Sequence, residues 1–210
     1  MKSNTTNNNT KSKILATALA LFNEFGLAKV TLRNIAQKMG ISQGNLCYHF
    51  KKREDILEAL YHQLVDLMNA VVHQAGMSLP TLNSFFQTSK KMMQHFYDYR
   101  FFMLDFVQIV RENESIHQHY KSLSILRKQQ FLAMFELWIH EGLMRPEEFE
   151  GEFDHLYLRS SILGDFWLSS AIIQQELNVD LVAQYNHIIF QNLYPYLTPK
   201  GKKQFQEIKF

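Results

Sequence analysis

The feature that most restricts the fold is a three-residue turn between two short helical segments near the start of the chain. Thr31 can cap a helix that Gly40 ends, and Ser42 can cap a second helix over residues 43–49. Gly40 can adopt the left-handed conformation that such a turn requires, and the small Ala36 lets two steeply crossed helices approach closely. This spacing predicts a helix-turn-helix unit.

An amphipathic helix precedes this unit. Apolar residues at 14, 18, 21, 22 and 25 share one helical face, so we expect a helix from about Thr10 to Phe25 that Gly26 ends. The run 14–22 after two lysines imitates a signal peptide, but no small-residue cleavage site follows it. Residues 1–10, rich in Asn and Thr, predict a disordered tail before a helix-turn-helix domain over residues 11–53.

Charge is distributed unevenly along the chain. Residues 1–53 contain nine Lys and Arg and one acid, Glu24, although the net charge of the whole chain is only +2. A basic head on an acidic body favours binding to a polyanion such as nucleic acid, and the alternative is a positive surface that is merely solvated.

The rest of the chain, residues 54–210, contains few helix breakers. With 8 Gly and 4 Pro in 210 residues and no alternation of period two, the sequence predicts an all-α protein. The expected helices of the body cover residues 53–74, 81–97, 100–112, 114–141, 152–176 and 179–197. No window of eighteen residues is predominantly apolar, so we expect no membrane span. The single cysteine, Cys47, indicates a reducing compartment, the cytoplasm.

The segment Thr31–Leu57, with Gly-Ile-Ser at 40–42 and Tyr-His-Phe-Lys at 48–51, resembles the DNA-binding signature of TetR-type transcriptional regulators. The close resemblance covers about residues 11–60. It implies an N-terminal three-helix helix-turn-helix DNA-binding head and a C-terminal helical domain for ligand binding and dimerisation. It also implies a homodimer that binds double-stranded operator DNA and responds to a small-molecule effector. A repressor released from a palindromic operator is the expected function, and activation stays open.

Roles in DNA binding follow from the position of residues in the motif. Early residues of the recognition helix face base edges, and amides suit bidentate contact with adenine. Ser42 is expected to cap the helix more than to contact bases, and Thr31 and Lys52 are weaker phosphate candidates. The predicted DNA-binding residues are Arg33, Ser42, Gln43, Gly44, Asn45, Tyr48, His49, Lys51 and Arg53. Cys47 departs from the family, where most members carry tyrosine, and it is either a simple filler or a redox sensor.

The family's middle helices enclose an effector pocket and its last two long helices form the dimer. The predicted effector-binding residues are Phe102, Asp105, Phe106, His117, Met134, Phe135, Trp138 and Trp167, with Asp165 as a further polar candidate. Small residues that permit close helix crossing and an apolar side of the last helix predict a dimer interface, with the alternative that this face packs within its own chain. Its predicted residues are Ser160, Gly164, Ala171, Tyr185, Ile188 and Ile189.

Two other functions are compatible with parts of the sequence. Glu114 with His117 and Glu152 with His155 repeat the Glu-x-x-His spacing of di-iron helical bundles. Both pairs fall near predicted helix starts, where a carboxylate is favoured by the helix dipole alone. We therefore expect no enzyme, no metal and no cofactor. A helical adaptor that has lost DNA binding is the remaining alternative, and it depends on Cys47.

Overall fold

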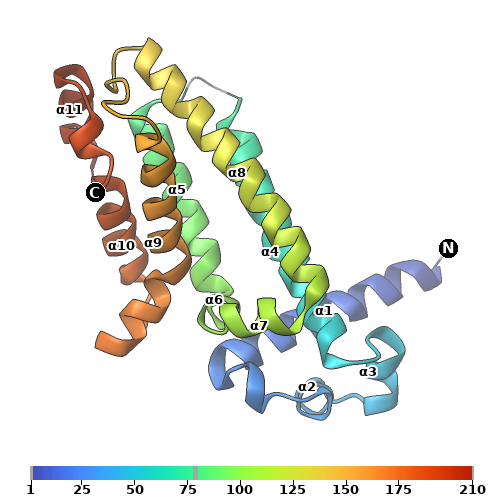
Figure 1. The fold of residues 1–210 in the computed structure, drawn as a ribbon. Helices are drawn as coiled ribbons and strands as arrows, with labels where there is room; N and C mark the ends of the chain where they lie inside the picture. Colours follow the sequence, from blue (N-terminus) through green and yellow to red (C-terminus); the bar gives the residue numbers. More distant parts are fainter. Residues whose placement is uncertain (1, 78–79, 210) are drawn as a thin grey trace.

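The computed structural model describes residues 2–77 and 80–209, and all its regular elements in these ranges are helical. In Figure 1, the short helices α2 and α3 lie with α1 at one end of a body of longer helices, which confirms the predicted all-α fold. In chain order the elements are α1 (Lys2–Phe25), η1 (Leu27–Lys29), α2 (Leu32–Met39), α3 (Gln43–His49), α4 (Arg53–Ala75), α5 (Leu82–Asp98), α6 (Arg100–Leu104), α7 (Phe106–Glu112), α8 (Glu114–His140), α9 (Glu152–Gln174), α10 (Asp180–Gln191), η2 (Tyr194–Tyr196) and α11 (Pro199–Gln206).

The predicted turn joins α2 and α3. The Thr31 hydroxyl accepts a hydrogen bond from the Asn34 backbone N–H at 3.2 Å, and the Asn34 side chain accepts one from the Thr31 N–H at 2.9 Å, so the two residues form a capping box. Gly40 ends α2 with φ of 66°, in the left-handed region. Ile35 of α2 and Leu46 of α3 are fully buried in one core cluster with apolar residues of α1, which fixes the crossing of α2 and α3.

The first helix is longer than the sequence predicts. We expected a disordered segment over residues 1–10, whereas α1 begins at Lys2. Asn and Thr have low helix propensity, which is why the sequence places the start near Thr10. Elongating an established helix costs less than nucleating a new one, so the apolar turns from Ile14 onward can support the extension.

The head is tied to the body at two places. α4 begins in the head and continues into the body, burying Ile56 and Leu60 on the way. Asn23 of α1 makes the second link, because its side chain donates to the Asp98 carbonyl at 2.7 Å and accepts from the Phe101 N–H at 3.0 Å. These bonds hold α1 against the joint between α5 and α6.

The body departs from the predicted elements in two segments. The single helix expected over 100–112 is divided into α6 and α7 at Asp105, whose φ of −99° and ψ of 13° are not those of an α-helix. The helix expected over 179–197 ends at Gln191, and a 3₁₀ turn over 194–196 precedes α11, which was not predicted. Pro195 explains why α10 ends at Gln191, since a proline disrupts the interior of a helix.

The longer helices of the body pack against one another around its centre. α5 packs between α4 and α10, and α9 packs against α6, α8 and α10. A second buried cluster forms around Phe135 and Trp138 of α8 and includes Phe205 of α11. Among the described residues, no helix is long and apolar enough to cross a membrane.

Candidate nucleic-acid interface and internal cavity

The start of α3 presents polar groups to solvent. The Ser42 hydroxyl accepts from the Asn45 N–H at 3.2 Å, so Ser42 caps the helix. Gln43, Gly44 and Asn45 are exposed, while Leu46 is fully buried. Because Gly44 carries no Cβ, a flat surface can approach this turn of the helix closely. The exposed amides can donate and accept a hydrogen bond at the same time, and this pattern is complementary to the edge that adenine presents in the major groove.

Cations and a phenol surround this turn. Arg33, Lys51 and Lys52 are exposed, and the Tyr48 side chain is 77% exposed with its ring against His49 at a centroid distance of 5.3 Å. Although its ring touches His49, a phenol this open to solvent leaves its hydroxyl available to a partner.

Arg53 is placed differently from the other predicted phosphate contacts. Its guanidinium donates to the Leu27 carbonyl at 3.0 Å and lies 3.6 Å from the Glu54 carboxylate. These interactions hold α4 to the end of α1 through η1. The structure therefore gives Arg53 a role within the head. Cys47, the departure from the resemblance, is half-buried beside Tyr48.

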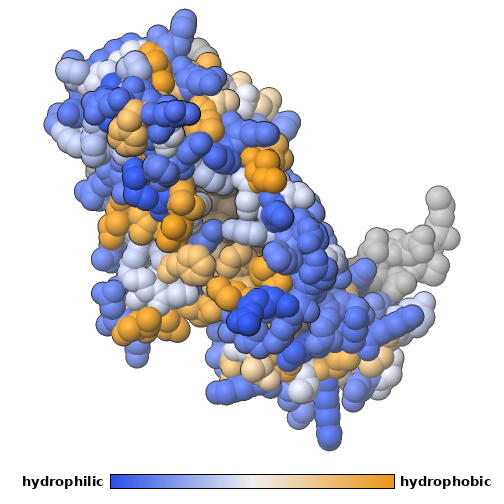
Figure 2. Space-filling model, in the orientation of Figure 1, coloured by the Kyte–Doolittle hydropathy of each residue, from blue (hydrophilic) through white to orange (hydrophobic). Residues whose placement is uncertain are grey.

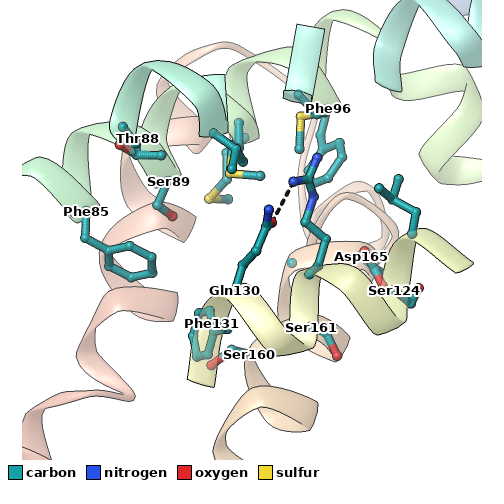
Figure 3. A pocket seen from close by; sticks show the side chains of 18 of the residues that line it. Phe85, Thr88, Ser89, Phe96, Ser124, Gln130, Phe131, Ser160, Ser161 and Asp165 are labelled. Carbon is teal, nitrogen blue, oxygen red and sulfur yellow. Dashed lines mark hydrogen bonds between the residues drawn. The ribbon is translucent and has the colours of Figure 1, made fainter. Parts of the chain in front are cut away.

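The body encloses a cavity of about 1030 Å³, at the upper end of the range for small-molecule sites. Helices from α4 to α10 contribute to its wall, in which methionine and phenylalanine are the most frequent residues. Figure 2 shows the surface hollowed in the middle of the body, with hydrophobic residues around the hollow. Figure 3 shows Phe85, Phe96 and Phe131 among the side chains of the wall, together with Ser160 and Ser161 of α9.

Few polar groups face this cavity, and most are paired within the chain. The Tyr120 hydroxyl donates to the Asp165 carboxylate at 2.8 Å, and burial raises the pKa of Asp165 to about 6, while the hydrogen bond from Tyr120 acts in the opposite direction. Burial and the neighbouring Asp165 raise the pKa of Tyr120. Ser89 donates to the buried Asn186 side chain at 2.6 Å.

The predicted effector residues divide into two groups. Phe102, Phe106, Met134 and Asp165 line the cavity. The other five lie elsewhere: Asp105 is at the joint between α6 and α7, His117 is exposed beside Glu114, Phe135 and Trp138 are fully buried in the second core cluster, and Trp167 packs against Tyr185. The aromatic content of the sequence did not separate cavity from core, because both need large apolar side chains.

Sequence reasoning missed Arg127 and Tyr120 as cavity residues. Both lie on α8 with Met134, and the three are seven residues apart, so they share one face of the helix. Extending the prediction for Met134 along its own face would have found them. Tyr61 of α4 was also missed; its hydroxyl is 2.8 Å from His119 Nδ1, and burial raises its pKa to about 12.

The predicted dimer helices expose an apolar face, but mostly through other residues. Ser160, Gly164 and Ile189 line the cavity, Ala171 is fully buried, and Tyr185 packs on Trp167. Only Ile188 of the predicted set is exposed. α9 is apolar on more than one side, so its small residues turn inward while larger ones face solvent. The exposed apolar residues of this face are Leu158, Ile162, Phe166 and Ile173 on α9 and Ile188 on α10.

The two Glu-x-x-His pairs are engaged locally. The Glu152 carboxylate is buried and accepts two hydrogen bonds from Arg145, at 2.7 and 2.8 Å, which together with the Glu148 N–H lower the pKa of Glu152 to about 2. His117 lies 3.9 Å from Glu114 on the surface. In the described part of the chain, no three His, Cys, Asp or Glu side chains are grouped as metal ligands.

Comparisons with known proteins agree with this arrangement. Residues 14–60 match the model of the bacterial regulatory proteins of the tetR family, and residues 63–205 match a bacterial transcriptional repressor model, TetR. The transcriptional repressor KstR2 of Mycobacterium tuberculosis H37Rv is 24% identical over 144 residues, 67% of this chain and 72% of its own length.

Two solved structures share the fold. A TetR-family regulator from Marinobacter aquaeolei VT8 superposes with a TM-score of 0.85 at 22% identity, covering 94% of this chain and 96% of its own. A transcriptional regulator from Saccharomonospora viridis, in complex with choline, has a TM-score of 0.71 at 19% identity and covers 91% and 99%.

Proposed function

We propose, given that the chain belongs to the TetR family of bacterial transcriptional regulators, that it is a homodimeric repressor which a small molecule releases from a near-palindromic operator. One observation carries this proposal. α3, in the head, exposes two amide side chains and a glycine at its first turn, and the body of the same molecule contains a large cavity. The head and the cavity are joined by α4, which has residues in both.

We expect α3 to enter the major groove, with Gln43 and Asn45 on base edges and Gly44 allowing the close approach. Lys51, Arg33, Tyr48 and His49 would contact phosphates on either side, and these contacts carry affinity without sequence information. Arg53 supports the head instead, since its guanidinium is already engaged with Leu27 and Glu54.

The second copy would pack on the exposed face of α9 and α10. Leu158, Ile162 and Phe166 form a stripe along α9, and contiguous exposed apolar residues of this kind mark an interaction site. A two-fold dimer places two copies of α3 on one side of the DNA. The operator half-sites would then be about 34–36 Å apart, or a multiple of that distance.

The cavity would hold the effector. Its size and its mainly apolar wall fit a small molecule, and the choline complex of the Saccharomonospora viridis regulator supports small-molecule binding in this fold. Tyr61 of α4 lines the cavity, so a ligand that displaces Tyr61 would move the helix that carries the head. The bonds of Asn23 to the joint of α5 and α6 give a second connection to α1.

Selection of bound fragments from genomic DNA, followed by footprinting, tests the proposal. We expect enrichment of a near-palindrome with two protected half-sites at the stated separation. Asn45→Ala should lose this enrichment, and Gln129→Ala, which removes an exposed amide on α8, should retain it. Failure of the wild-type protein to enrich any sequence would favour the adaptor alternative.

A further inference from the structure

Arg127 is a cation in the wall of the cavity without an acidic partner. Its guanidinium donates to the Gln130 side chain at 2.8 Å, the dashed line in Figure 3, and to the Asn69 side chain. Both acceptors are neutral amides, and none of the ion pairs among the described residues includes Arg127. A guanidinium has five N–H donors, so several remain for a ligand.

The other charged group of the cavity can reduce its own charge, whereas Arg127 cannot. Burial raises the pKa of Asp165 to about 6, and the carboxylate already accepts the Tyr120 hydroxyl. Burial also lowers the pKa of Arg127, but an arginine remains protonated in proteins. A partly buried fixed charge is stabilised most by an opposite charge, so the missing partner of this cavity is an anion.

The position of Arg127 determines the shape of that anion. Asn69 and Gln130, which hold the guanidinium, are exposed, so this end of the cavity is near solvent. Met93, Phe102 and Phe106 line the cavity as well, and all three are buried. The cavity thus has a cation near its surface and a mainly apolar interior, in which the hydrogen-bonded Tyr120–Asp165 pair lies beside Phe106.

We propose that the effector is an amphipathic anion, with a carboxylate or phosphate head on Arg127 and an elongated apolar body in the interior of the cavity. A planar guanidinium donates two parallel hydrogen bonds to either head group. This inference rests on the proposed function, because it names the ligand class of the same regulatory cavity.

Calorimetric titration with four probes of one chain length tests the proposal: decanoate, decyl phosphate, decanol and decyltrimethylammonium. We expect one or both anions to bind more tightly than decanol, and the cation to bind more weakly than decanol. The preference between decanoate and decyl phosphate identifies the head group. Tighter binding of decyltrimethylammonium than of both anions would overturn the proposal and point to Asp165 as the site of a cation.

Variants separate the charge from the apolar contacts. Arg127→Gln should weaken binding of the preferred anion about 10- to 100-fold and leave decanol within about 2-fold, because it removes the charge-assisted contact and leaves the apolar wall in place. Arg111→Gln, at an exposed arginine of α7 outside the cavity, should change neither the affinity for the anion nor the affinity for decanol. If Arg127→Gln does not fold, Gln130→Glu places a competing carboxylate beside the guanidinium and should also weaken the anion. Unchanged anion binding in the folded variants, or no binding of any probe, would overturn the inference.

Operator binding is measured on the same samples without any probe. We expect Arg127→Gln to retain operator affinity, since the cavity lies outside the head. If the wild-type protein binds the operator but does not bind the anionic probes more tightly than decanol, only the proposed ligand class is rejected. Loss of operator binding by the wild-type protein rejects the proposed function itself.

Discussion

We expect the exposed side chains of the head to divide into those that read bases and those that bind the backbone of DNA. Gln43 and Asn45 carry amides at the first turn of α3, whereas Lys51 is a point charge beyond its end. An amide that pairs with one base discriminates between sequences, and a phosphate contact does not. The motif made these residues predictable from sequence. The engagement of Arg53 was not predictable, because it depends on the carbonyl of Leu27, which precedes the motif.

Substitutions on α3 and after it should therefore differ in kind. Asn45→Ala should cost about 1–3 kcal/mol on the operator and little on random DNA, while Lys51→Ala should weaken both equally and reduce the salt dependence. Titration of each variant against both DNAs at several salt concentrations measures this. Equal losses on operator and random DNA for Asn45→Ala would show that α3 is not the reading helix.

Asp165 gives the stability a pH dependence with a defined sign. Its pKa is about 6 in the folded chain and near the ordinary value of 3.8 when unfolded, so the folded state binds more protons between these values. This carboxyl therefore lowers the free energy of unfolding as pH rises through that window. Relative to wild type, the free energy of unfolding of Asp165→Asn should therefore rise by about 2–3 kcal/mol between pH values of about 4 and 7. Urea unfolding at both pH values checks this, and an equal difference at both would be inconsistent with a buried, ionising Asp165.

At the scale of elements, periodicity identified the long helices but not which side of each one is buried. α9 carries apolar residues on several sides, so the sequence did not show that the small Ser160 and Gly164, predicted to lie at an interface, line the cavity. α11 was missed although Thr198 and Pro199 are ordinary start signals, because its eight residues contain few apolar positions. It forms through tertiary packing on α5 and on the segment around Leu143.

Gly201 of α11 allows this packing. A Cβ at this position would overlap the Leu143 carbonyl oxygen, so Gly201→Ala forces the two segments apart. We expect a loss of about 1–3 kcal/mol of stability, measured by urea unfolding. Gly164→Ala is the matched control: its Cβ has no atom within 4 Å, and it should gain about 0.5–1 kcal/mol from helix propensity. A stabilising Gly201→Ala would mean that α11 does not dock as described.

At the scale of the molecule, binding to a near-palindromic operator requires two copies of the chain. Ile162→Asp places a charge in the exposed stripe of α9 and should yield a monomer in light scattering, because a buried unpaired charge is costly. Ile125→Asp changes an exposed isoleucine of α8, outside that stripe, and should leave the dimer intact. A dimeric Ile162→Asp would place the interface on another surface.

The most direct test of sequence-specific DNA binding is the affinity ratio between the selected fragment and a scrambled duplex at one salt concentration. Specific regulators bind their sites about 10³-fold or more tightly than other DNA. We expect a ratio of at least that size for the wild-type chain, reduced by Asn45→Ala and unaffected by Gln129→Ala. Equal affinity for the two duplexes would contradict the account, and it would leave the basic head as a surface that binds polyanions without reading them.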